Sequence, residues 1–218
     1  MHKSIDNLNE IKKKIYSKNL ENKSVARVIA VTKTFSMEHI SHLIDNGHLD
    51  FGENKVQEAI DKWSEVKSNS PDLKLHMIGK LQTNKVKNAV KLFDYIHSLD
   101  SIKLAKKIFE EQNKIKKRLK IFIQVNIGNE NQKNGVPVDD LKNFYKNCVK
   151  DFDLDIIGLM CLPPANINPS KYFKQMYSIA RELSLNELSM GMSSDYLDAI
   201  ENGATYIRIG SKIFGSRS

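Results

Sequence analysis

Lys33 stands where a lysine could do chemistry, because it follows directly on the end of an apolar run. The surrounding residues read VIAVTKTF, so a strand suited to burial ends at a hydroxyl and an amine. One interpretation is structural, with the aliphatic stem packed and the ammonium group in water. The other is that partial desolvation lowers the pKa of the amine, and the neutral amine attacks an aldehyde. The second interpretation requires other residues that hold the aldehyde in place.

Two later segments carry residue types that suit a phosphate group. In MGMSSD we expect a helix to begin directly after a strand, with the hydroxyls of Ser193 and Ser194 and free N–H groups facing an anion. In RIGS, Gly210 allows the backbone to approach closely and Ser211 adds a hydroxyl. Helix capping is the alternative role of the two serines. Together with Lys33, these segments indicate a phosphorylated aldehyde, and pyridoxal 5'-phosphate (PLP) is the leading candidate.

Arg208 narrows the chemistry of such a site. An arginine on a buried strand needs a partner, and an ion pair with an acid such as Glu53 is one solution. As a partner of the pyridine nitrogen, its guanidinium would donate a hydrogen bond while staying charged, which keeps that nitrogen unprotonated. The ring is then a poor electron sink. This favours racemase-like chemistry or simple binding over transamination.

Short apolar segments alternate with helical patterns along the whole chain, after an opening helix at about 3–20. We expect seven helices between eight strands and a brief tail after the last. The pattern predicts one domain, residues 1–218, folded as an α/β, TIM-like (β/α)8 barrel with an extra N-terminal helix; an open doubly wound sheet is the alternative. The expected strands are residues 27–33, 48–54, 73–79, 94–100, 121–127, 156–162, 187–191 and 204–210.

Polar residues stand at the carboxyl end of nearly every expected strand. In a parallel barrel these ends meet at one mouth, which is where barrel enzymes place their sites. The sequence therefore predicts a site at this mouth. The residues collected there are Thr32, Lys33, Glu53, Asn54, His76, His97, Ser98, Gln124, Asn126, Met160, Ser193, Ser194, Arg208, Gly210 and Ser211.

Ordered motifs run along nearly the whole chain. They are AVTKT (30–34), FGENKVQEA (51–59), LHMIGKLQTNK (75–85), IHSLDS (96–101), QVNI (124–127), GLMCLP (158–163), LSMGMSSD (188–195) and RIGSKIFGSR (208–217). In these motifs the chain resembles the pyridoxal phosphate homeostasis proteins, single-domain relatives of the alanine racemase barrel.

The resemblance implies the type III fold of PLP proteins, with Lys33 carrying PLP as an internal aldimine. It places Asn54 near the cofactor and Arg208 at the pyridine nitrogen, and it puts His76 near the pocket. No catalytic residue and no metal ligand are expected. The predicted cofactor-binding residues are Lys33, Asn54, His76, Met160, Ser193, Arg208, Gly210 and Ser211.

Three positions depart from the family pattern. Leu75 stands where many members have tryptophan, Cys161 where a small residue is usual, and Phe35 where a second lysine is common. Because Phe35 cannot accept PLP from Lys33, transfer between neighbouring amines would need another group. Lys133 is our hypothesis for that group.

Family members are regarded mainly as cytosolic PLP carriers or buffers that affect vitamin B6 and amino-acid balance, without established catalysis. We therefore expect a monomeric carrier in the cytoplasm, with PLP and PLP-accepting apo-enzymes as partners. The alternative is a weak PLP-dependent amino-acid racemase or related enzyme. Racemases of this type take a tyrosine from a second, β-rich domain. Since only a short tail follows the last expected strand, we expect one face of PLP to stay open to water.

Composition weighs against other classes of function. The net charge of +8 and the basic segment 103–120 could indicate a nucleic-acid partner, but apolar residues at helical spacing place most of its lysines on a solvated face. Ser101 is the expected N-cap of this helix. The sequence has no apolar run of membrane length, no signal-type segment, and two cysteines without metal or redox spacing. We expect neither a membrane nor a nucleic-acid partner.

Overall fold

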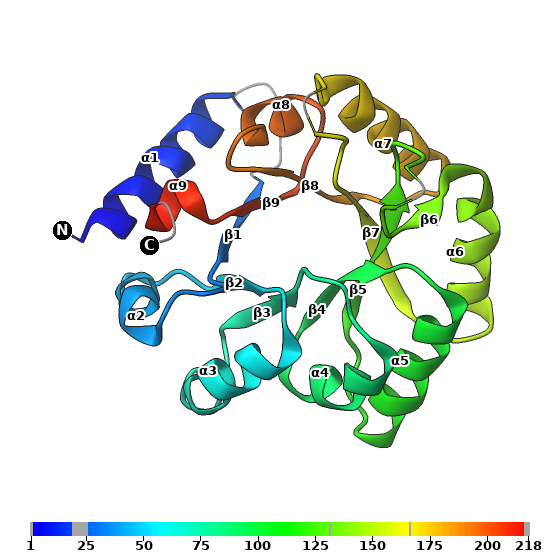
Figure 1. Cartoon of the computed structure of the whole chain (residues 1–218), viewed down its shortest axis with the longest axis horizontal. Coiled ribbons are helices and arrows are strands. Elements are labelled where there is room, and N and C mark those ends of the chain that lie inside the picture. Colours follow the sequence, from blue (N-terminus) through cyan, green and yellow to red (C-terminus); the bar gives the residue numbers. More distant parts are fainter. Residues whose placement is uncertain (1, 19–25, 131, 166, 216–218) are drawn as a thin grey trace.

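Parallel strands close into a barrel with helices around it (Figure 1). The computed structural model describes residues 2–18, 26–130, 132–165 and 167–215. The strand order runs β4-β3-β2-β1-β9-β8-β7-β5, and pairing of β4 with β5 completes the ring. The predicted (β/α)8 barrel is confirmed, and the open sheet is wrong. The barrel strands are β1 (Arg27–Val31), β2 (Asp50–Glu53), β3 (Lys74–Met77), β4 (Tyr95–Leu99), β5 (Lys120–Asn126), β7 (Asp155–Cys161), β8 (Glu187–Met192) and β9 (Tyr206–Ile209).

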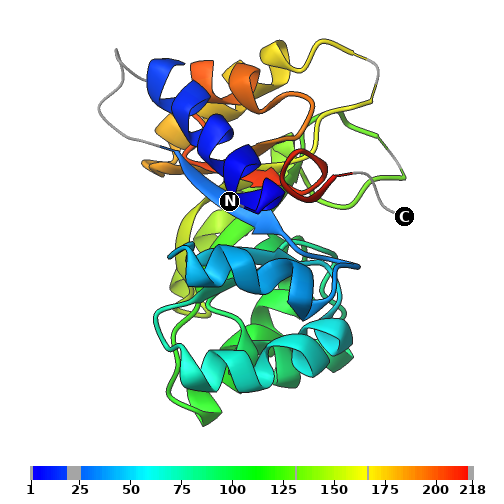
Figure 2. The same ribbon diagram turned by 90° about the vertical axis from the view of Figure 1, so that its left-hand side faces the viewer.

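One helix of the outer ring follows each barrel strand, and α1 precedes them all. In Figure 2, α1 crosses the outside of the barrel next to α9, which it contacts together with α8. The extra N-terminal helix is thus confirmed through Lys18, and its expected last two residues lie outside the described residues. The helices are α1 (Lys3–Lys18), α2 (Met37–Asp45), α3 (Val56–Asn69), α4 (Val86–Leu92), α5 (Ile102–Lys114), α6 (Leu141–Lys150), α7 (Ser170–Glu182), α8 (Tyr196–Glu201) and α9 (Ser211–Phe214).

Short elements account for the differences from the expected pattern. β6 (Val136–Pro137) pairs with β5 outside the ring, and 3-10 turns precede α4 and α6 at Thr83–Lys85 and Val138–Asp140. The expected tail contains α9. None of these pieces is long enough to show a period of 2 or 3.6 residues, so the sequence pattern did not reveal them.

The barrel strands are buried on both faces, which explains their nearly continuous apolar runs. Inside the ring, side chains from five strands pack together: Ile29, Tyr95, Phe122, Met160 and Tyr206. Outside it, helical residues such as Trp63 on α3 are fully buried against the strands. This double layer fixes the strand ends on which the site is built.

The basic helix α5 directs most of its lysines toward solvent. Leu104, Ala105 and Ile108 are buried, while Lys103 and Lys106 are exposed. Ser101 caps the helix by accepting a hydrogen bond from the backbone N–H of Leu104 at 3.4 Å, as expected. This arrangement agrees with a solvated face. In the described part of the chain, no helix is long and apolar enough to cross a membrane.

Candidate functional site

A cavity of about 500 Å³ opens at the carboxyl ends of the strands. Its size is that of an ordinary small-molecule site. Six of the eight predicted cofactor residues line it, so the site lies at the predicted mouth; His76 and Met160 do not line it. The lining residues are Val31, Lys33, Phe35, Asn54, Ile78, Gly79, Leu162, Met192, Ser193, Ser194, Arg208, Gly210, Ser211 and Gly215.

The turn after β1 presents Lys33 to this cavity. β1 ends at Val31, and Lys33 is partly buried two residues later. Buried Thr32 fixes the turn, because its hydroxyl donates to Glu53 Oε1 at 2.7 Å and its carbonyl accepts from Lys62 Nζ at 2.9 Å. Thr34 adopts a positive φ of 69° in the same turn. The strand therefore ends before the lysine, which resolves the question of a lysine inside a buried strand.

Glu53 is the anchor behind this turn. Its side chain is fully buried, and Oε1 accepts from Thr32, from Lys62 Nζ at 2.9 Å and from Trp63 Nε1 at 3.0 Å. The ion-pair partner of Glu53 is therefore Lys62 on α3. Through these bonds Glu53 holds the backbone next to Lys33 in place.

Asn54 and Gly79 form one wall of the cavity. A Cβ atom on Gly79 would come within 2.3 Å of the Asn54 carbonyl oxygen, so only glycine fits there. The side-chain oxygen Oδ1 of Asn54 is buried and has no hydrogen-bond partner among the described residues. A buried acceptor without a partner at a cavity is a fitting contact for a bound ligand.

Arg208 reaches the cavity from β9 and is only 5% exposed. Its guanidinium donates to Ser189 Oγ at 2.7 Å and to the Cys161 carbonyl at 3.0 Å. Among the described residues no carboxylate pairs with it, so the ion pair with Glu53 is wrong as an interpretation. Burial lowers the pKa of Arg208, yet a guanidinium stays charged in proteins. The cavity therefore contains a buried positive charge.

The serines at the mouth occupy a turn rather than a helix start. α8 begins at Tyr196 with Asp195 as N-cap residue, and the Asp195 carboxylate accepts from the Met192 N–H at 2.6 Å. The expected helix start at Ser193 and Ser194 is thus wrong, because Asp195 takes the capping position. Both serines line the cavity, where the Ser193 hydroxyl accepts weakly from the Lys212 N–H at 3.4 Å.

Gly210 and Ser211 complete the same corner. Gly210 is the N-cap residue of the four-residue helix α9, and a Cβ atom on it would lie 3.3 Å from the Val31 carbonyl oxygen. The backbones of β1 and of this turn therefore approach closely. The hydroxyl of Ser211 joins those of the neighbouring turn at the cavity wall.

The other two predicted residues lie deeper in the barrel. His76 is fully buried, and its ring bonds to Asp50 and His97. Met160 is 1% exposed within the interior cluster. Their proposed roles at the cofactor stay predictions. The sequence reasoning missed the apolar wall residues Leu162 and Ile78, although each stands near the carboxyl end of an expected strand.

Lys133 lies outside the residues that line the cavity. Its ammonium pairs with Glu130 at 2.7 Å and donates to the Pro163 carbonyl at 3.2 Å. Cys161, a departure from the family pattern, is buried on β7, and burial raises the pKa of its thiol to about 12. A neutral thiol adds no charge near Arg208. The transfer role of Lys133 stays a prediction.

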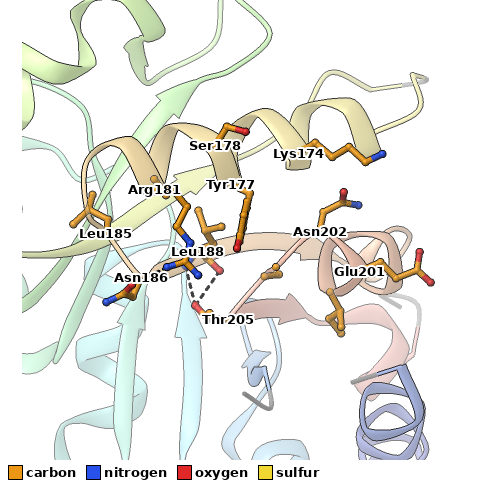
Figure 3. A pocket seen from close by; sticks show the side chains of 14 residues that line it. Lys174, Tyr177, Ser178, Arg181, Leu185, Asn186, Leu188, Glu201, Asn202 and Thr205 are labelled. Atoms are coloured by element: carbon orange, nitrogen blue, oxygen red, sulfur yellow. Dashed lines mark hydrogen bonds between the residues drawn. The ribbon is translucent and has the colours of Figure 1, made fainter. Parts of the chain in front are cut away.

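Two larger cavities lie toward the opposite end of the barrel. One, of about 690 Å³, is lined by α7 and the starts of β8 and β9 (Figure 3), and the other, of about 790 Å³, lies beside α1. In the first, Arg181 stacks on Tyr177 and donates to Asn186. These groups satisfy one another. The smaller mouth cavity, with an amine, a guanidinium and several hydroxyls, is the one suited to a phosphorylated aromatic aldehyde.

The family model for the N-terminal domain of alanine racemase matches residues 5–218. The pyridoxal phosphate homeostasis protein of Aquifex aeolicus is 38% identical over 201 residues, covering 88% of this chain and 87% of the relative. That of a Synechocystis strain is 38% identical over 203 residues, covering 88% and 91%.

Solved structures are also similar to this chain over nearly its whole length. PipY of Synechococcus elongatus, without PLP, has a TM-score of 0.89 and 33% identity over 98% of this chain and 100% of that one. The same protein with PLP bound has a TM-score of 0.83 and 35% identity over 94% and 100%. An alanine racemase of Clostridium difficile, 16% identical with a TM-score of 0.75, shares the fold; this chain covers 57% of it.

Proposed function

Because this chain belongs to the pyridoxal phosphate homeostasis proteins, a family with the alanine racemase N-terminal domain, we propose that it binds PLP in the mouth cavity. We propose further that Lys33 holds PLP as a Schiff base and that the protein is a carrier or buffer of PLP. The observation that carries the proposal is the convergence of Lys33 and Arg208, from opposite ends of the chain, on one cavity with a hydroxyl-rich corner.

PLP supplies an aldehyde, a phosphate and a pyridine ring to such a site. The Lys33 amine forms a bond to the aldehyde carbon, and the aldehyde oxygen leaves as water. Ser193, Ser211 and the backbone at Gly210 suit the phosphate, since hydroxyls and close backbone N–H groups bind anions. Arg208 donates to the ring nitrogen and keeps it unprotonated.

The polar groups of the cavity favour a carrier over a racemase. Apart from Lys33, the polar side chains that line it in the described chain are Asn54, Arg208 and three serines. Racemisation requires one base on each face of the substrate carbon. Amide, guanidinium and serine hydroxyl groups are poor bases at neutral pH. These groups bind and orient, which supports a role in holding PLP.

The proposal is tested on the wild-type protein by absorbance, reduction and peptide mapping. We expect an absorbance band at about 420 nm after incubation with PLP, its loss on borohydride reduction, and a reduced pyridoxyl label on the peptide that contains Lys33. Labelling of other lysines with Lys33 unmodified would contradict the attachment. The absence of both band and label would contradict PLP binding through a Schiff base.

The racemase alternative has its own measurement. The PLP-loaded protein is incubated with L-alanine or L-serine in deuterated water, and loss of the α-hydrogen signal is followed by NMR. We expect no exchange that depends on Lys33, because the described residues that line the cavity include no good second base. Exchange that disappears in a Lys33→Ala variant would favour the enzyme.

Location, oligomeric state and the acceptors of PLP complete the proposed role. We propose that the protein works in the cytoplasm as a monomer and delivers PLP to apo-enzymes. The relatives named as pyridoxal phosphate homeostasis proteins, which this chain covers over most of their length, support the part of this proposal that concerns PLP homeostasis.

A further inference from the structure

A chain of hydrogen bonds crosses the inside of the barrel from its amino end to the mouth cavity. Asp50 Oδ1 lies 3.1 Å from His76 Nε2, and His76 Nδ1 lies 3.0 Å from His97 Nε2. His97 Nδ1 lies 2.8 Å from Ser189 Oγ, which accepts from Arg208 at 2.7 Å. We call these five residues the relay. They connect a carboxylate at one end of the barrel to the guanidinium at the other.

The relay is shielded from solvent over most of its length. His76, His97 and Ser189 are 0% exposed, and only the Asp50 side chain, at 19%, reaches the surface. Aromatic rings cover both imidazoles: Tyr95 stacks on His76 at 4.2 Å between centroids, and Phe122 stacks on His97 at 4.3 Å. Buried polar atoms in such surroundings must satisfy one another.

Donor chemistry fixes the direction of every link. The Asp50 carboxylate can only accept, so neutral His76 donates to it from Nε2 and accepts at Nδ1. Neutral His97 then carries its proton on Nε2, donates to His76 Nδ1 and accepts at Nδ1 from the Ser189 hydroxyl. Arg208 can only donate, so Ser189 Oγ accepts from it as well. Both histidines are therefore Nε2–H tautomers.

One added proton reverses the direction in which the members of the relay donate to one another. If the Asp50–His76 unit takes up a proton, His76 carries a proton on Nδ1 and donates to His97 Nε2. His97 must then move its own proton to Nδ1 and donate to Ser189. Ser189 Oγ receives two donors and turns its proton away. The rearrangement of hydrogen bonds thus extends to Arg208, while the added charge stays at the Asp50–His76 unit.

Burial favours the unprotonated state of the two histidines in the relay. Burial lowers the pKa of His76, although Asp50 partly opposes this, and burial together with His76 holds the pKa of His97 well below its usual range. Burial is the largest single influence on Asp50 and would raise its pKa, but the hydrogen bond from His76 and the charges of His76, His48 and Arg27 together lower the pKa. The other titratable or charged groups nearby are Arg27, His48, Asp94, Tyr95, Asp195 and Tyr206.

We propose that Asp50, His76 and His97 are positioning residues for the cofactor site, which orient the Arg208–Ser189 pair through a one-directional relay that a proton at the Asp50 end reverses. The consequence for PLP rests on the proposed function. When the Asp50–His76 unit is unprotonated, Ser189 Oγ accepts from Arg208 alone, and the guanidinium stays oriented toward the ring nitrogen. When the unit is protonated, Ser189 Oγ accepts from both Arg208 and His97, and PLP is held less tightly.

The relay itself is tested without PLP, by NMR of the full-length protein labelled with ¹⁵N in histidine. At neutral pH we expect both rings to show a protonated Nε2 and an unprotonated Nδ1. On acidification, His97 should exchange Nε2–H for Nδ1–H at the midpoint at which the Asp50–His76 unit takes up its proton, while staying neutral. A protonated Nδ1 on either ring at neutral pH, or a His97 that does not respond, would overturn the proposal.

The link to the cofactor site is tested with Asp50→Asn, because an amide offers both a donor and an acceptor and imposes no direction. We expect both His97 tautomers at neutral pH and PLP affinity about fivefold lower, the factor of one ordinary hydrogen bond. Asp50→Glu should restore both readouts. Asp94→Asn is the matched control: it removes a carboxylate charge at the same end of the barrel, where Asp94 bonds to Lys67 and to the Leu75 N–H but to no member of the relay.

The outcomes separate this proposal from the proposed function. An unchanged His97 ring and unchanged PLP affinity in Asp50→Asn would overturn the coupling, even with PLP attached to Lys33. Equal weakening by Asp94→Asn would overturn it as well, since charge alone would then be responsible. A wild-type protein that does not bind PLP would refute the function and the consequence for PLP, while the tautomers in the apo-protein still decide the relay.

Discussion

Replacing Lys33 with alanine is expected to abolish covalent retention of PLP. After incubation with PLP, borohydride reduction and desalting, the variant should carry no pyridoxyl group, and the band at about 420 nm should be absent. The reason is chemical: among the residues that line the mouth cavity in the described chain, Lys33 supplies the amine, while Phe35 is apolar. The measurement is mass spectrometry of the reduced protein beside the wild type.

The fold should tolerate this substitution. Lys33 is only partly buried, and hydrogen bonds made by Thr32, Glu53 and Glu58 help to hold its turn. We expect the free energy of unfolding to change by less than about 1 kcal/mol. PLP should still bind reversibly through its phosphate and ring, about 10- to 100-fold more weakly.

Lys55→Ala is the matched control for Lys33. Lys55 is exposed beside Asn54 at the same mouth, so its removal takes away a nearby positive charge without touching the cavity lining. We expect this variant to retain PLP as the wild type does. Covalent labelling that persists in Lys33→Ala, or that disappears in Lys55→Ala, would refute Lys33 as the attachment point.

Replacing Glu53 with alanine is expected to destabilise the protein by about 3–5 kcal/mol, the range for breaking a buried ion pair from one side. The substitution removes the acceptor of Thr32, Lys62 and Trp63 at once and leaves the Lys62 ammonium, only 11% exposed, without its buried counterion. Glu53→Gln should fall between alanine and wild type, because an oxygen remains while the charge is lost. The measurement is urea unfolding. We expect the midpoint to fall while the m-value stays unchanged, which reports a change in stability.

Glu58→Gln separates this effect from any general loss of acidic charge. Glu58 contacts the same Lys62 ammonium at 3.1 Å, but its side chain is 27% exposed. We expect a change below about 1 kcal/mol, since partly exposed ion pairs contribute little. If Glu53→Ala and Glu58→Gln had equal effects on stability, Glu53 would not be the anchor of the turn.

The alternating pattern of the sequence predicted the barrel because each barrel strand is buried on both faces and each helix on one. It also placed Lys33, Asn54, Arg208 and the serines at one mouth, since the carboxyl ends of parallel strands must converge. It placed His76 and Met160 in the same set, although they lie deeper in the barrel. Position along the chain does not say whether a side chain near a strand end faces the cavity or the layer below it.

The start of α8 shows a similar limit. Ser193, Ser194 and Asp195 are all good capping residues, and composition alone could not choose among them. In the structure Asp195 occupies the N-cap position without a capping hydrogen bond from its side chain; its carboxylate accepts from the Met192 N–H instead, and both serines stay in the turn. This difference of one or two residues leaves both serines in the turn that lines the cavity.

The sequence by itself determined the order of strands and helices, the lysine that follows β1, and the family to which the chain is similar. Only the closed barrel decided which distant residues meet. Asp50, His76, His97, Ser189 and Arg208 come from five strands, and no periodicity links them. They touch because pairing of β4 with β5 closes the ring and strand register sets their heights, pairing Gly52 with His76 and Met192 with Arg208. Contacts of this kind depend on register and closure, which are properties of the whole sheet.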